Sequence, residues 1–198
     1  MSNIRSAYNI PNMLTYARIL AVPAVAICFF VEGRLHSSDT ARWWALGIFV
    51  AAAITDFLDG YLARRLGQSS NIGKMLDPIA DKLLVATALL LLAADTDKTI
   101  QGWSLWAAII ILCREILIAG LREYLAGLKV SVPVSRLAKW KTTAQLVAIG
   151  FLLAGPAGDK VFPYTTETGL VLLWISAIVT LITGWDYFRA GLKHVVEE

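Results

Sequence analysis

The sequence predicts an all-α membrane protein of six transmembrane helices, and two observations support this fold class. First, 57% of the 198 residues are hydrophobic and the mean hydropathy is +0.62, which is more apolar surface than one small water-soluble core would bury. Second, six apolar stretches approach the ~20 residues that cross a hydrocarbon layer of ~30 Å. They are residues 13–31, 43–58, 79–94, 103–121, 143–155 and 168–188.

The polar segments between these stretches define the order of the helices. Residues 1–12 are weakly amphipathic and predict a short juxtamembrane segment, after which Pro11 redirects the chain. The second apolar stretch is short, but its helix can continue through residues 56–65 and leave the membrane. Turn-forming residues at 67–71 then predict a tight connection that makes the second and third helices antiparallel neighbours. Further breaks are expected at 95–102, 127–138 and 155–167.

The distribution of Lys and Arg predicts the orientation, because positive charge is retained on the cytoplasmic side. One set of helix ends carries only Arg34, Arg42, Lys98 and Lys160. The other carries Arg5, Arg64, Arg65, Lys74, Lys129, Arg136, Lys139, Lys141, Arg189 and Lys193. We therefore expect both termini in the cytoplasm, one transmembrane domain at 13–190 and a cytoplasmic tail at 191–198. The net charge of +3 suits anionic lipid head groups, and no nucleic-acid partner is expected.

Four aspartates border or enter apolar helices, where an unpaired charge costs several kcal/mol. Asp56 and Asp59 are three residues apart and Asp77 and Asp81 are four apart, so each pair projects from one helical face. The turn at 67–71 is expected to bring the two faces together. Close carboxylates repel one another unless cations lie between them, and all-oxygen ligation favours Mg²⁺, Mn²⁺ or Ca²⁺. A magnesium ion with open positions suits a diphosphate, which indicates transfer of a phosphoryl-type group.

Small residues accompany the acids, namely Gly60, Ala63 and Gly73, and they allow a backbone or a substrate to approach closely. Gly73 could instead simply mark a turn. Arg64 stands one turn past the first acids and could hold a phosphate oxygen. The alternative for the whole cluster is a set of buried ion pairs, with Arg64, Lys74 and Lys82 as partners of the acids.

Read in order, these residues give D-x-x-D-G-x-x-A-R-x8-G-x3-D-x3-D between Asp56 and Asp81, which resembles the signature of the CDP-alcohol phosphotransferase family. The resemblance implies a six-helix membrane enzyme, generally a homodimer, with two metal ions on a CDP-linked diphosphate. It implies that Asp56, Asp59 and Asp77 are metal ligands. Asp81 would bridge a metal and act as general base on the acceptor hydroxyl. The residues that it places at the CDP-linked lipid include Gly60, Ala63, Arg64, Ser70 and Gly73.

A second group of charges lies in the fourth and fifth stretches. Arg114, Glu115 and Arg122 fall within a sector of about 100° on one helix. Either Glu115 and Arg122 form a self-contained ion pair, or an arginine binds an anionic substrate group that Glu115 helps to orient. Lys139, Lys141 and Thr142 follow at the start of the fifth helix and would complete a basic pocket. The two lysines cannot share one helical face, so we expect only one to reach substrate.

The first helix carries Pro11, and then Asn12, Thr15 and Arg18 at intervals of three residues, a polar stripe that could flank the nucleotide or its phosphates. The alternative is an N-cap by Asn12 or Thr15 and an Arg18 that snorkels to the interface. N-I-P-N-x-L-T-x-x-R, together with R-E-x6-R and K-x-K-T-T, resembles the family members that use glycerol 3-phosphate. This implies transfer of phosphatidyl from CDP-diacylglycerol to sn-glycerol 3-phosphate, giving phosphatidylglycerophosphate and CMP, at the cytoplasmic face of a bacterial inner membrane.

Other functions remain open at this point. A transferase of the same family could use inositol phosphate or phosphatidylglycerol as acceptor. An intramembrane prenyltransferase also uses paired aspartates with magnesium, although its motifs lie farther apart. A divalent-cation transporter could bind its ion at the acids, although the sequence lacks matching helix breaks in two halves.

Overall fold

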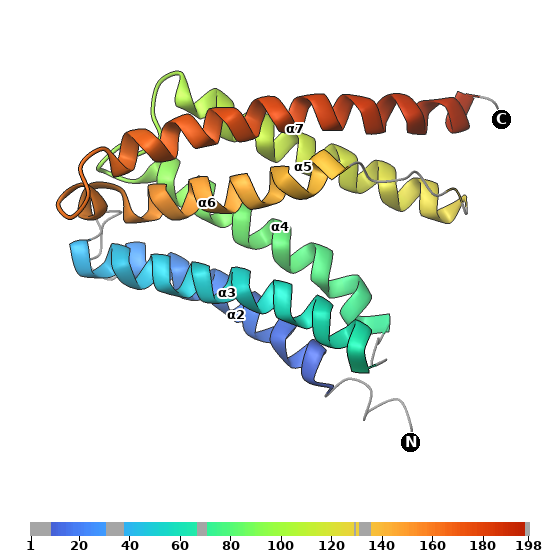
Figure 1. Cartoon of the computed structure of the whole chain (residues 1–198), viewed down its shortest axis with the longest axis horizontal. Helices are drawn as coiled ribbons and strands as arrows, with labels where there is room; N and C mark the ends of the chain where they lie inside the picture. Colours follow the sequence, from blue (N-terminus) through green and yellow to red (C-terminus); the bar gives the residue numbers. More distant parts are fainter. Residues whose placement is uncertain (1–8, 31–37, 67–70, 129, 131–135, 197–198) are drawn as a thin grey trace. The chain divides into compact units, whose positions relative to one another are not determined.

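The computed structural model describes residues 9–30, 38–66, 71–128, 130 and 136–196. For residues 10–11, 59–66, 71, 74, 136–139 and 193–196 it describes the backbone alone. Six helices make up this part of the chain, in agreement with the predicted all-α class (Figure 1). They are α2 (Ile10–Phe30), α3 (Asp39–Leu66), α4 (Asn71–Ala94), α5 (Ser104–Gly127), α6 (Arg136–Asp159) and α7 (Thr165–Val196). Each predicted apolar stretch falls on one of them to within a residue.

Four of the described helices are long and apolar enough to cross a bilayer, and they make the chain a multi-pass membrane protein. The spans are Asn12–Phe30, Asp39–Leu58, Ser104–Gly127 and Thr165–Leu192. Large apolar side chains such as Leu20, Phe57 and Ile116 are exposed along these helices, as expected for a surface that faces lipid. The predictions of two further spans, on α4 and α6, and of cytoplasmic termini stay predictions.

The helix boundaries refine the predicted segments. The second helix continues through residues 56–65 as predicted, because α3 is unbroken from Asp39 to Leu66. Pro11 does not precede the first helix but lies in its first turn, where the missing N–H of proline is tolerated. At the other end, α7 continues to Val196 and makes most of the predicted tail helical.

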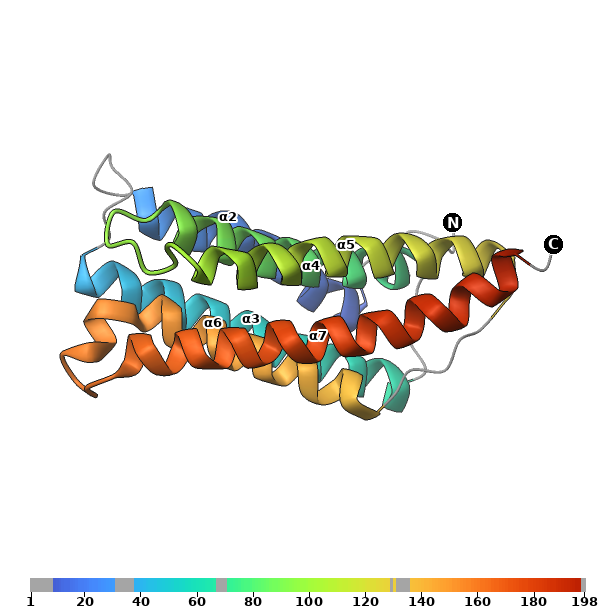
Figure 2. The ribbon, with the colours of Figure 1, turned by 90° about the horizontal axis from the view of Figure 1, so that it is seen from above.

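The chain divides into two compact units, which are described separately. The first contains Met1–Thr99 and Gly150–Thr166, and the second contains Ile100–Ile149 and Glu167–Glu198. In the first unit α2 packs along both α3 and α4, as Figures 1 and 2 show. The described residues of α3 and α4 touch each other much less. In this part of the chain α2 therefore lies against both helices of the predicted antiparallel pair.

The first unit also contains a buried charge cluster around Arg42. Its guanidinium donates to the carboxylates of Asp95 and Asp97, to the Thr99 hydroxyl, and to the carbonyl of Leu153 at 3.4 Å. Arg42, counted above among the charges of one set of helix ends, is almost fully buried and therefore also has a packing role inside the unit. These acceptors compensate the buried guanidinium, and removing one of them would leave a buried charge without its full set of partners.

A kink in α6 adjoins Arg42. Gly155 has φ +44° and ψ −130°, and Pro156 follows it. A Cβ at Gly155 would lie 2.7 Å from Nη1 of Arg42, so only glycine fits this conformation and this approach. The predicted break therefore begins at residue 155, but a helical turn resumes after it as far as Asp159.

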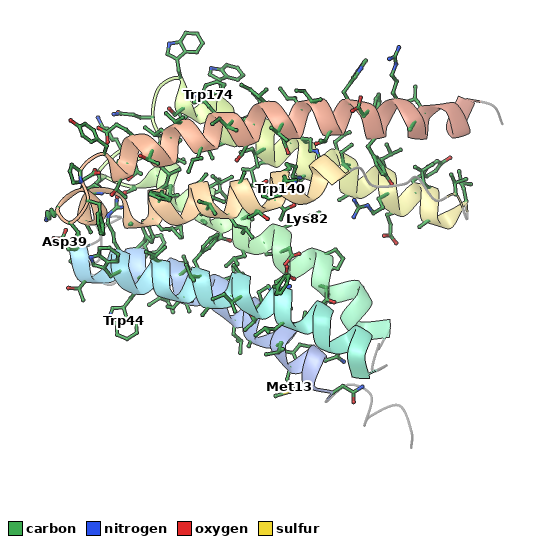
Figure 3. The ribbon with its side chains drawn as sticks, in the orientation of Figure 1. Met13, Asp39, Trp44, Lys82, Trp140 and Trp174 are labelled. Atoms are coloured by element: carbon green, nitrogen blue, oxygen red, sulfur yellow. The ribbon has the colours of Figure 1, made fainter. Side chains whose placement is uncertain are left out.

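In the second unit α5 packs on α7, where a Cβ at Gly191 would lie 3.1 Å from side-chain carbons of Leu121 and Leu125. The absence of a Cβ on Gly191 permits this close approach. In each unit, exposed tryptophans lie mostly toward helix ends, which is typical of residues at a membrane–water interface. Trp44, for example, points away from α3 (Figure 3).

Candidate active site

The predicted metal ligands lie on two helices of the first unit, α3 and α4. Asp56 is on α3, and Asp77 and Asp81 are on α4. Asp59 lies one turn after Asp56 on α3, and its side chain is outside the described ones. The start of α2, the end of α3 and the start of α4 meet at one end of this unit (Figure 1), which gathers the polar residues of all three helices there.

Arg18 on α2 links the acids of the other two helices. Its Nη1 lies 2.7 Å from Oδ1 of Asp56 and 2.8 Å from Oδ1 of Asp81. The Arg18 side chain is 0% exposed, whereas those of Asp56 and Asp81 are 38% and 49% exposed. The alternative in which Arg18 snorkels to the interface is therefore wrong. The two aspartates pair with the buried guanidinium of Arg18, while their own carboxylates remain partly exposed.

The polar stripe of α2 also reaches the third acid. The hydroxyl of Thr15 donates a hydrogen bond of 2.5 Å to Oδ1 of Asp77. Asn12 and Thr15 are both almost fully buried, and neither is an N-cap, because α2 begins at Ile10. The stripe predicted from the three-residue spacing thus exists. Sequence reasoning missed that Thr15 and Arg18 of this stripe pair with the aspartates.

The oxygen donors present suit a hard divalent cation. Two carboxylate oxygens from different helices converge on one cationic nitrogen, so this place attracts positive charge. Among the described side chains, no three of His, Cys, Asp or Glu are grouped closely enough to hold a metal, and Asp59 is not among them. Asp56, Asp59, Asp77 and Asp81 would together supply an all-oxygen set, and their role as ligands stays a prediction.

The other residues predicted near the acids are placed as follows. Gly73 is buried in the first turn of α4, so it lies inside a helix and does not simply mark a turn. The backbones of Gly60, Ala63 and Arg64 are in α3 and that of Pro11 is in α2, while Ser70 lies outside the described residues. Of the alternative partners for the acids, Lys82 donates to the Pro78 carbonyl at 3.0 Å instead. The side chains of Arg64 and Lys74 are outside the described ones.

The second predicted group forms a connected cluster within the second unit. Arg114 on α5 donates from Nε to the carbonyl of Thr180 at 3.1 Å and from Nη2 to the hydroxyl of Thr183 at 3.3 Å. Its Nη1 lies 3.2 Å from Oε1 of Glu115, and Lys141 of α6 forms an ion pair with the same oxygen. The cluster therefore joins α5, α6 and α7 through two cations and one acid.

Glycine and an aromatic ring shape the surroundings of these cations. A Cβ at Gly184 would lie 2.9 Å from Cγ of Arg114, so this glycine leaves room for the arginine. Arg122 lies over the ring of Tyr187, 5.8 Å from its centroid, so the alternative of an isolated Glu115–Arg122 pair is wrong. Sequence reasoning missed Thr180, Thr183 and Gly184, although polar and small residues at one-turn spacing on α7 were a signal.

Only Lys141 of the two predicted lysines has a described side chain, and it is buried on the side facing Glu115. Burial lowers the pKa of Lys141, and the positive charges of Arg114 and Arg122 add to this shift, whereas Glu115 opposes it. Thr142 beside it is exposed, and the Lys139 side chain is outside the described ones. Lys141 thus joins the arginine cluster through Glu115.

Comparison with known proteins defines the class. The family model for CDP-alcohol phosphatidyltransferase matches residues 8–182, and the chain therefore belongs to this family. It is 45% identical over 188 residues to the CDP-diacylglycerol–glycerol-3-phosphate 3-phosphatidyltransferase of Rickettsia bellii, covering 94% of this chain and 97% of the relative. The relatives of that name in Cereibacter sphaeroides and Bacillus subtilis are 40% and 37% identical, covering 96% and 91% of this chain and 99% and 94% of the relatives. These matches confirm the resemblance that the aspartate motif indicated.

Proposed function

We propose that the chain transfers the phosphatidyl group from CDP-diacylglycerol to sn-glycerol 3-phosphate, giving phosphatidylglycerophosphate and CMP for phosphatidylglycerol and cardiolipin synthesis. The observation that carries this proposal is the match, over 94% of the chain, to a relative named for this reaction. We further propose a homodimer in the bacterial inner membrane with its site on the cytoplasmic side. The positive-charge distribution and the bacterial origin of the relatives support this location.

The aspartates suit the diphosphate of CDP-diacylglycerol. Two magnesium ions, with manganese as the alternative, would be held by Asp56, Asp59, Asp77 and Asp81, and when bound they neutralise phosphate charge and stabilise the departing CMP. Asp81 accepts the proton of the acceptor hydroxyl while that oxygen forms a bond to the β-phosphorus and the bond to CMP breaks. The partial exposure of the Asp81 carboxylate supports this role, because an acceptor can reach it.

The cations of the second unit suit an acceptor that bears a phosphate. Arg114 is held from the side by Thr180, Thr183 and Glu115, so its guanidinium is pre-organised. Lys141 adds a second positive charge through the same glutamate. The remaining predicted acceptor contacts are Arg122, Lys139 and Thr142. A free polyol without phosphate would not use this concentration of positive charge.

The reaction is tested with purified protein, CDP-diacylglycerol and Mg²⁺. We expect CMP to be released only when glycerol 3-phosphate is added. Asp81→Asn should abolish the release, whereas Asp186→Asn, on an exposed residue of α7, should have no effect. A panel with glycerol, inositol phosphate and phosphatidylglycerol tests the acceptor. Release with any of these but not with glycerol 3-phosphate would refute the acceptor, and metal flux in proteoliposomes without CMP release would favour a transporter.

A further inference from the structure

The Arg18 guanidinium occupies the point where two of the proposed metal ligands meet. Its Nη1 contacts Oδ1 of both Asp56 and Asp81. We propose that Arg18 is an internal counter-cation, which pairs with these carboxylates and competes with a divalent ion for their oxygens. This inference rests on the proposed role of the aspartates as ligands, and it assigns to Arg18 the setting of the metal affinity.

The first argument is geometric. A single nitrogen lies at hydrogen-bond distance from an oxygen of α3 and an oxygen of α4, so both oxygens point to one place. A metal ion shared by the two carboxylates needs lone pairs on the same side. The guanidinium and the ion therefore draw on the same donor atoms, and binding of the ion weakens the contacts of Arg18.

The second argument is burial. The Arg18 side chain is fully buried, so its guanidinium is held inside the first unit. Moving it into water would require repacking of α2 against α3 and α4, because α2 lies along both helices. Its positive charge consequently remains close to the site after an ion has entered, where it repels that ion.

The third argument is the difference between Arg18 and its neighbour on the same face of α2. Thr15 donates a neutral hydrogen bond to Asp77, which orients this carboxylate without neutralising it. Arg18 instead supplies a full charge to Asp56 and Asp81. Of the two interactions, only that of Arg18 compensates the repulsion between carboxylates that would otherwise oppose folding without metal.

The test measures Mn²⁺ binding to the purified, metal-free protein by the loss of the free-ion electron paramagnetic resonance signal. Arg18→Gln removes the charge, and we expect it to bind Mn²⁺ about tenfold more tightly than wild type while melting at a lower temperature without metal. Arg18→Lys keeps a charge but reaches one carboxylate at a time, and should bind with intermediate affinity.

Arg42 offers a matched control, because it is equally buried and is also paired with two carboxylates, Asp95 and Asp97, that are not predicted ligands. Arg42→Gln should lower the melting temperature and leave Mn²⁺ affinity within about twofold of wild type, since additive effects are expected at independent sites. If Arg18→Gln does not fold, Arg18→Lys carries the test, and it should still bind Mn²⁺ more tightly than wild type.

Three outcomes are distinguishable. Tighter Mn²⁺ binding by the Arg18 variants, but not by Arg42→Gln, supports the competition. A second outcome is that folded Arg18 variants bind Mn²⁺ no more tightly than wild type, while the separate Asp77→Asn variant binds it more weakly. This outcome overturns the competition and leaves the proposed metal site intact. A wild-type protein that binds no Mn²⁺ overturns the proposed metal site, and the inference with it.

Discussion

The hydroxyl of Thr15 on α2 donates to Oδ1 of Asp77 on α4 at 2.5 Å, across 62 positions of the chain. This hydrogen bond fixes the orientation of a carboxylate that is proposed to bind metal. Residues that hydrogen-bond to metal ligands commonly control both the geometry of the site and its affinity. Thr15 is therefore a positioning residue for the site.

Thr15→Val keeps the shape of the side chain and removes the donor. We expect the Mg²⁺ concentration at half-maximal rate to rise about tenfold, as is typical when such a partner is lost. The unfolding free energy should fall by about 1 kcal/mol, because Asp77 is only half-buried and water can replace the hydroxyl. CMP release measured over a Mg²⁺ series, together with thermal unfolding in detergent, checks both values.

Thr15→Ser is the control, because serine retains the hydroxyl on a similar side chain. Its Mg²⁺ dependence should stay close to that of wild type. Equal Mg²⁺ dependence in the valine and serine variants would show that the hydrogen bond has no influence on the metal site.

The sequence was sufficient for the helices and for the aspartate motif, because both depend on local spacing. Apolar runs predicted the helices, and the polar end of α3 was expected since its acids and small residues keep a helical period. The contacts of Arg18 could not be predicted in this way. Asp56 and Asp81 lie far from Arg18 in the sequence, so helical spacing cannot relate them. An arginine that snorkels to the interface would also give the same sequence pattern.

Arg42 illustrates the same limit at the other end of the first unit. A single arginine near the end of an apolar run is ordinarily a topology charge. The partner of Arg42, Asp95, lies 53 residues away in the sequence, so local spacing does not reveal the pair. The kink at Gly155, which lies against the Arg42 guanidinium, appears in sequence only as a Gly-Pro dipeptide. Tertiary packing, not local preference, determines the role of this charge.

The lowered pKa of Lys141 predicts a pH dependence of acceptor binding. Burial disfavours the ammonium form, so the lysine loses its charge at a lower pH than the ordinary value of 10.5. As the pH rises through this shifted pKa, KM for glycerol 3-phosphate should increase about tenfold, because the proposed charged hydrogen bond from Lys141 to the acceptor phosphate is lost. KM for CDP-diacylglycerol should change less. Initial rates measured from neutral pH up to the pKa of free lysine check this prediction.

Lys141→Arg tests the assignment, since arginine remains protonated over this whole range. The alkaline increase of the acceptor KM should disappear in this variant, even if its KM at neutral pH differs from wild type. Persistence of the same increase in Lys141→Arg would assign the titration to another group.

Gly184→Ala should impair acceptor binding through Arg114. The new Cβ would lie 2.9 Å from Cγ and 3.0 Å from Nε of Arg114, and it would push the guanidinium away from Thr180 and Thr183. We expect KM for glycerol 3-phosphate to rise about tenfold, because misplacement of a substrate-positioning group by a fraction of an ångström is costly. Gly120→Ala on α5 is the control, since no atom lies within 4 Å of its Cβ. Equal acceptor KM values for the two variants would exclude a role for the position of Arg114.

Gly155→Ala should destabilise the first unit without direct effect on the aspartates. The backbone at Gly155 has φ +44°, and an alanine Cβ would meet Nη1 of Arg42 at 2.7 Å. Strain and the disturbed ion pair together should lower the unfolding free energy by about 2 to 4 kcal/mol. Gly150→Ala is the matched control on the same helix, because its nearest neighbour, Cδ1 of Leu46, lies 3.6 Å away in ordinary contact. Thermal unfolding in detergent should separate the two variants by several degrees, whereas KM for both substrates, measured at a temperature at which both are folded, should match wild type. Equal melting temperatures would mean that Arg42 moves aside without cost.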